Sequence, residues 1–220
     1  MNGMKLNINS NEELSNVASE LMFQTFTDTI IVNNDLINKN VVSGAMKQAR
    51  NKALAYIMED EELLKNCTLL SPEHTILRSV LSKNRIYEDE TVESLNKFPN
   101  GDVAGGSVQR VIRGFLKKCE KAPVNFSTLY YELKQPPFGL RDGYLPILLS
   151  YELRSFENVS IYFHGTERDY SVEELLKAFD SPEDYTLYIS NWEPEQIWYI
   201  NNLEDLFNRY INKQSKNRLK

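Results

Sequence analysis

The sequence predicts a mainly helical protein with a small β component, in which an N-terminal helical subdomain precedes a winged-helix-like subdomain. Long stretches have apolar residues at helical spacing, one stretch alternates as a strand does, and a glycine-rich break divides the chain. We place the boundary at that break, with subdomains over residues 1–104 and 105–220. The chain has 220 residues, 41% of them hydrophobic, so it is long enough to bury a sizeable core.

The N-terminal half is predicted to be a series of helices. The first begins at Ser10, where Glu13 completes a capping box. Its apolar residues recur at helical spacing: Leu14, Val17, Ala18, Leu21 and Met22. A second helix is expected over residues 43–58. A third should follow Ser71 and Pro72, which match a capping residue and a proline in the first helical position.

The second half begins with an amphipathic helix over residues 107–121, and further helices are expected at 128–134 and 140–155. A strand at 159–164, a turn at Gly165 and a short partner strand at 168–171 then form a hairpin. A helix at 172–179, a strand at 185–189 and a closing helix at 194–211 complete the prediction. Three helices followed by a small hairpin is the element order of a winged helix-turn-helix.

The helix over residues 140–155 tests whether such a fold would read DNA bases. A recognition helix must present Arg, Lys, Asn or Gln side chains to base edges in the major groove. Here apolar and aromatic residues cover nearly the whole circumference: Tyr144, Leu145, Ile147, Leu148, Leu149, Tyr151 and Leu153. A helix that is apolar all round is buried, which argues against base recognition by this helix.

A stripe of basic residues is the candidate site for nucleic-acid binding. At 100° per residue one face of the 107–121 helix gathers cations, with a further lysine beside them: Arg110, Arg113, Lys117, Lys121 and Lys118. Residues 107–122 hold five basic residues against one acidic residue, whereas the whole chain has a net charge of −6. The stripe is either a phosphate-binding surface or an ordinary solvated helix face.

The segment at residues 136–143 is the candidate partner-binding loop. Its two prolines restrict the backbone, and its glycines permit close approach of other chain segments. One interpretation is a loop presented to a partner through Pro137, Phe138, Arg141 and Asp142. The other is a stiff interhelical turn whose charges suit the end of the next helix.

The remaining motifs point away from catalysis. The chain has no GxxxxGK[ST], GxSxG or HExxH pattern, so we expect no catalytic residues and no cofactor. Its two histidines, His74 and His164, are far apart and neither lies near a cysteine, so no metal site is expected. No apolar run reaches the roughly 18–20 residues that span a bilayer, and no secretory signal pattern is present. We therefore expect a non-enzymatic cytoplasmic protein that does not insert into membranes.

Two segments resemble parts of the large P-loop ATPases of bacterial phage-defence systems, including the ATPase of BREX-type loci. One is NNDLINK at residues 33–39, followed by Ser43, Ala45, Ala49 and Arg50. The other is LKQPPFGLRDG at residues 133–143, followed by PILL at residues 146–149. The resemblance implies a helical and winged-helix region that lies C-terminal to a nucleotide-binding domain.

Because the nucleotide-binding motif is not in this sequence, the resemblance implies a non-catalytic coupling region. Such a region would act through protein contacts with the remainder of a larger ATPase or with another protein partner. The alternative hypothesis is a winged-helix module that contacts the phosphates of duplex DNA through the basic helix face.

Overall fold

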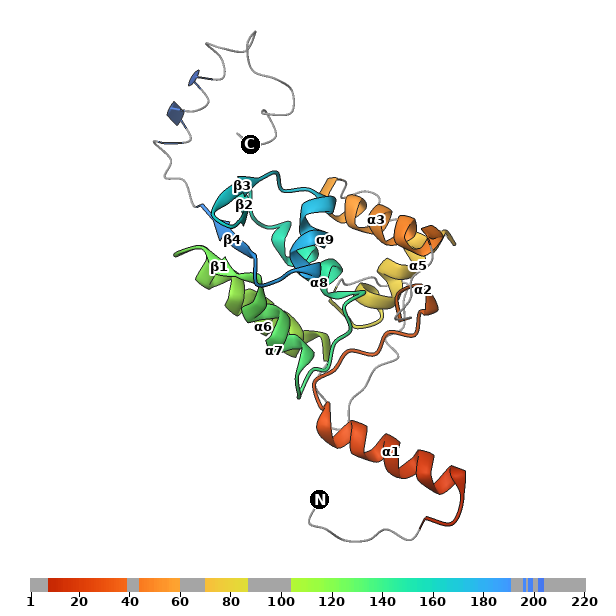
Figure 1. Ribbon diagram of the computed structural model, residues 1–220. Coiled ribbons are helices and arrows are strands. Elements are labelled where there is room, and N and C mark those ends of the chain that lie inside the picture. The colour runs from red at the N-terminus through yellow and green to blue at the C-terminus, as the bar shows by residue number, and fades with distance from the viewer. Residues whose placement is uncertain are drawn as a thin grey trace.

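The computed structural model describes residues 8–38, 44–59, 70–86 and 104–190, together with Gln196, Trp198, Tyr199, Asn202 and Leu203. Over these residues the chain is mainly helical with one small antiparallel sheet, which confirms the predicted secondary-structure class. Figure 1 shows a compact body with a single helix, α1, standing away from it. Most of the predicted closing helix at 194–211 lies outside the described residues.

The N-terminal half contains α1 (Asn11–Thr25), α2 (Asp35–Asn38), α3 (Gly44–Glu59), α5 (Pro72–Leu77) and the π-helical turn η1 (Arg78–Ser82). Helix α1 begins as predicted, because the Ser10 hydroxyl accepts a hydrogen bond from the Glu13 backbone N–H at 3.1 Å. Ser71 caps α5 with Pro72 in the first turn, also as predicted. Local signals therefore positioned these helix starts.

The second half contains α6 (Ala104–Cys119), β1 (Val124–Asn125), α7 (Phe126–Lys134), α8 (Leu145–Leu153), β2 (Val159–Phe163), β3 (Thr166–Arg168), α9 (Val172–Asp180) and β4 (Tyr185–Ile189). Helix α8 is shorter than the predicted 140–155, because residues 142–144 form a turn before it. Strand β3 begins and ends earlier than the predicted 168–171. The tight turn that sets its register has positive φ at both His164 and Gly165.

The sheet has the strand order β1-β4-β2-β3, and every neighbouring pair is antiparallel. In β4 the side chains of Tyr185, Leu187 and Ile189 are buried, and the two residues between them are half-buried. Ile161 in β2 pairs with Leu187, and both are fully buried. One face of the sheet therefore forms part of the core, as an alternating pattern requires.

The core is built around α8, which contacts α3, α6, α9 and η1 (Figure 1). Buried side chains from both sides of the predicted boundary near residue 104 form one cluster, which includes Leu54 and Ile76 as well as Leu116 and Leu148. The boundary itself remains a prediction. Helix α8 would be the recognition helix of a DNA-reading winged helix. Its position between the two halves of the chain therefore matters for function.

Candidate functional site

Helix α1 leaves its apolar residues exposed. None of its residues is buried, and Leu14 and Met22 are 52% and 58% exposed. Val17 and Leu21, on the same face, are half-buried. Helix α1 contains three acidic residues, Glu12, Glu13 and Glu20, and no basic residue. The predicted amphipathic pattern is thus present, but the described residues of the chain do not bury its apolar face.

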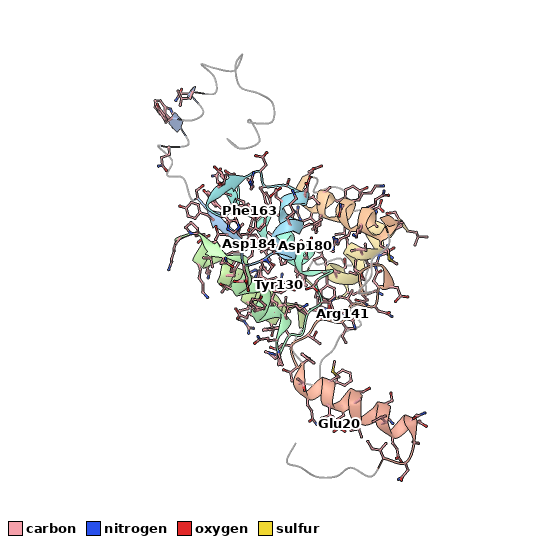
Figure 2. All side chains as sticks on the ribbon, viewed as in Figure 1. Glu20, Tyr130, Arg141, Phe163, Asp180 and Asp184 are labelled. Carbon is pink, nitrogen blue, oxygen red and sulfur yellow. The ribbon has the colours of Figure 1, made fainter. Side chains whose placement is uncertain are left out.

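Residues 26–38 connect α1 to the body and are held by the predicted partner-binding loop. The Asp28 N–H donates to the Pro137 carbonyl at 3.1 Å, and the Arg141 guanidinium donates to the Asn38 carbonyl. Figure 2 shows Arg141 on the side of the body nearest α1, and Glu20 out on α1 itself. The loop therefore contacts another segment of its own chain.

The glycines of this loop are sites of close approach. Gly139 has φ +62, and a Cβ atom there would lie 2.4 Å from the Phe26 ring. A Cβ atom on Gly143 would lie 2.3 Å from the Ile37 carbonyl oxygen. Only glycine permits both contacts without displacing a neighbour, which explains the residue type at each position.

The side chains of the loop also have partners within the chain. Phe138 is only 7% exposed, so it belongs to the core. The Asp142 carboxylate accepts hydrogen bonds from the Tyr130 hydroxyl at 2.9 Å and from Lys134 Nζ at 2.7 Å. Burial, together with the neighbouring Asp142 carboxylate, raises the pKa of Tyr130. These contacts favour the interpretation of the segment as a stiff structural turn, although its role in binding a partner remains a prediction.

Helix α8 is buried along its length, as its composition predicted. Every residue from Leu145 to Leu153 is buried except Tyr151, which is half-buried. The polar Glu152 side chain is 7% exposed and points at α6. A helix enclosed in this way cannot enter a DNA groove without unfolding the core.

Glu152 is bound by two residues of α6. Arg113 Nε and Nη2 donate to its two carboxylate oxygens at 2.6 and 3.3 Å, and Gln109 Nε2 donates to the carboxylate at 2.8 Å. The hydrogen bond that Arg113 donates to Glu152 raises the pKa of Arg113. Sequence reasoning assigned Arg113 to the phosphate-binding stripe and missed this network. The sequence did contain a signal for it, because a single acidic residue in an otherwise apolar helix requires a cation or a hydrogen-bond donor beside it.

The other cations of the stripe face solvent. Arg110, Lys117, Lys118 and Lys121 are all exposed. The opposite face of α6 is in the core, where the buried residues are Val108, Ile112, Phe115, Leu116 and Cys119. The amphipathic prediction for this helix is confirmed, and the structure separates Arg113 from the four remaining cations.

Arg85 is a further cation that sequence reasoning missed. Its φ of 52 lies in the left-handed region, which costs a non-glycine residue about 1–2 kcal/mol. Its side chain is exposed, whereas its neighbours Asn84 and Ile86 are buried. The Ile86 N–H donates to the Leu81 carbonyl at 2.9 Å, a contact that ends the preceding helical turn. No sequence signal marks this position, since glycine is the usual residue at such a helix end.

The described residues contain no group of three or more His, Cys, Asp or Glu side chains that would hold a metal ion. His74 is buried, with Nδ1 2.6 Å from the Ser71 hydroxyl and its ring beside Tyr56. A cavity of about 330 Å³ lies at the ends of α3 and α8, and its lining includes Ile57, Phe156 and Tyr170. Burial raises the pKa of Tyr170, which keeps the phenol neutral. None of the described residues that line the cavity is a Ser, Cys or His nucleophile.

Among the described helices, none combines the length and apolar composition needed to span a bilayer. In comparisons with known proteins, no protein-family model, no curated protein and no solved structure matches the chain. Two exposed surfaces therefore bear on the function of the molecule: the apolar face of α1 and the basic face of α6.

Proposed function

We propose that this chain is a non-catalytic interaction region that docks onto a partner protein through α1. The exposure of Leu14 and Met22 on one face of that helix carries the proposal. Burying a side chain of this size gains about 1.5–3 kcal/mol, so covering the face would contribute substantially to an interface. A lone helix of 15 residues is also marginally stable in water, which gives α1 a second reason to bind a partner.

The partner in this proposal is the remainder of a large P-loop ATPase of the phage-defence type. The two segments that resemble that family lie against each other: Ile37 abuts Gly143, and α3 packs on α8. Segments that are a hundred residues apart in sequence thus form one continuous unit. Such a unit is suited to transmit or receive a conformational change, because packed elements move together.

The second half of the chain is proposed to be a winged-helix-like unit used for coupling. Helices α6, α7 and α8 precede the β2–β3 hairpin, which is the expected element order. Helix α9 and strand β4 are additions to that order, and β4 lies between β1 and β2. The burial of α8 supports a role in contacts between protein elements instead of base recognition.

Co-purification of the tagged chain with a co-expressed P-loop ATPase of the phage-defence type tests this function. A triple variant, Leu14→Gln, Leu21→Gln and Met22→Gln, removes the apolar face while keeping good helix formers. The matched control places the same residue on the opposite face, as Asn16→Gln and Ser19→Gln. We expect the wild-type and control chains to form a complex by size-exclusion chromatography with light scattering, and the triple variant to lose it.

Two results would overturn the proposal. One is a wild-type chain that stays monomeric in the presence of the ATPase. The other is a complex that the triple variant forms as well as the wild-type chain does. Circular dichroism of each variant establishes that its helix content is unchanged before binding is compared.

A further inference from the structure

The exposed face of α6 combines cations with uncovered backbone. Among residues 105–119 of this helix, every exposed residue is either a glycine or a cation: Gly106, Arg110, Arg113, Gly114, Lys117 and Lys118. A Cβ atom on either glycine would meet nothing within 4 Å, so no other described segment covers the face there. At 100° per residue, Arg110 and Lys117 lie about 20° apart on α6 and Lys118 lies about 80° from Arg110, while Lys121 is in the turn directly after the helix.

Arg85 lies at the flank of α6 and outside this row. A Cβ atom on Gly105 would lie 2.2 Å from the Asn84 carbonyl oxygen, and Gln109 Nε2 lies 3.5 Å from the Ile86 carbonyl oxygen. The neighbours of Arg85 therefore touch α6 at two positions that lie about 100–140° from Arg110 around the helix axis.

We propose that Arg110, Lys117, Lys118 and Lys121 form a surface that binds the phosphate backbone of duplex DNA. The proposal is independent of the docking function of α1, since it uses a different helix. From Arg110 to Lys118 the helix rises about 12 Å, which is enough to face a few phosphates of a duplex. The cations on this rigid helix can therefore lie opposite several phosphates at once.

The composition of the surface favours a duplex over other anions. Its exposed residues include no apolar side chain that would enter a membrane and no aromatic ring on which unpaired bases would stack. Binding does not depend on base sequence, because α8 is buried and the cations contact phosphates. Arg113 is excluded from the surface because Glu152 holds its guanidinium in a hydrogen-bonded ion pair.

Fluorescence anisotropy with a labelled duplex of 20 base pairs tests the proposal. At about 50 mM KCl we expect binding whose affinity falls steeply with salt, with a log–log slope of about −3.6 for four phosphate contacts. The double variant Lys117→Glu and Lys121→Glu should weaken binding at least about tenfold. The matched control, Lys47→Glu and Lys52→Glu, makes the same charge change on the exposed side of α3 and should stay within about twofold.

Arg85→Gly separates binding from folding. Glycine accepts the left-handed backbone without strain, so this variant should raise Tm by about 2–4 °C, and because Arg85 lies outside the row it should leave duplex binding within about twofold. The α1 triple variant should bind the duplex as the wild-type chain does. Loss of duplex binding and loss of the ATPase complex are thereby distinguishable.

Several outcomes would overturn the inference. The first is no binding to the duplex at 50 mM KCl, and the second is equal weakening by the α6 and α3 double variants. Equal or tighter binding to polyglutamate, to single-stranded DNA of the same length or to phosphatidylserine vesicles would assign the surface to another class of anion.

Discussion

Helices α1 and α6 are almost equal in length and each has a face with apolar residues at helical spacing, but only the face of α6 is buried. In α6 that face is in the core, where Ile112 and Leu116 are 1% exposed. In α1 the equivalent side chains of Leu14 and Met22 are more than half exposed. Helical periodicity therefore identifies which face of a helix is apolar. Whether that face is buried depends on whether another segment of the same chain packs against it.

The largest expected difference between the two helices is in stability. Leu116→Ala should lower the free energy of unfolding by about 2–5 kcal/mol, because it removes buried methyl groups and leaves a cavity. Leu14→Ala should change it by no more than about 0.5 kcal/mol, as is usual for an exposed site. Urea denaturation measures both. A cost of several kcal/mol for Leu14→Ala would show that α1 is packed in solution.

Thiol reactivity probes the buried face of α6 without altering it. Burial raises the pKa of Cys119 to about 12 from 9.0, which lowers its thiolate fraction at pH 8 about a thousandfold. In a Cys67→Ser background we therefore expect reaction with Ellman's reagent to be slow for the native chain and fast in urea. Equal rates in the two conditions would contradict the burial of Cys119.

The same shift has a consequence for stability at alkaline pH. The folded chain holds the Cys119 proton more tightly than the unfolded chain does. The contribution of this thiol to the free energy of unfolding is therefore complete below about pH 9. It is lost as pH rises from 9 towards about 12. The free energy of unfolding of the Cys67→Ser chain should fall across that range.

Gly139 tests how firmly α1 is joined to the body. Gly139→Ala and Gly165→Ala both introduce a Cβ atom at positive φ, but only the first meets the Phe26 ring. We expect Gly139→Ala to be the more destabilising variant by about 1–3 kcal/mol, measured by thermal denaturation. Equal costs for the two variants would show that the loop does not hold the segment that leads to α1.

The smallest predicted effect separates local from global stability. Ser10→Ala removes the cap of α1 and should weaken that helix by about 1 kcal/mol. Because α1 has no buried residue, hydrogen exchange of its amides should quicken about fivefold while the urea midpoint stays constant. Ser71→Ala, at the cap of the buried α5, should instead shift the midpoint. A midpoint shift for Ser10→Ala would contradict the exposed state of α1.

Several features followed from the sequence by itself because each depends on neighbouring residues. The helix starts at Ser10 and Ser71, the strand at 185–189, the apolar face of α6 and the burial of α8 are examples. Capping bonds, side-chain periodicity and the cost of exposing an apolar helix all act within one or two turns. Such local causes can be recognised without knowing what lies nearby in space.

Other features depend on residues that only the tertiary structure brings together. Arg113 is tied to Glu152, which is 39 residues away, and the glycine-rich loop contacts residues 26–38 of its own chain. Arg85 lies beside α6 because Asn84 and Ile86 touch the first turns of that helix. No periodicity encodes such pairs, since they arise when the core closes around α8. The sequence determined which surfaces are apolar or basic, and the packing decided which of them remain available to a partner.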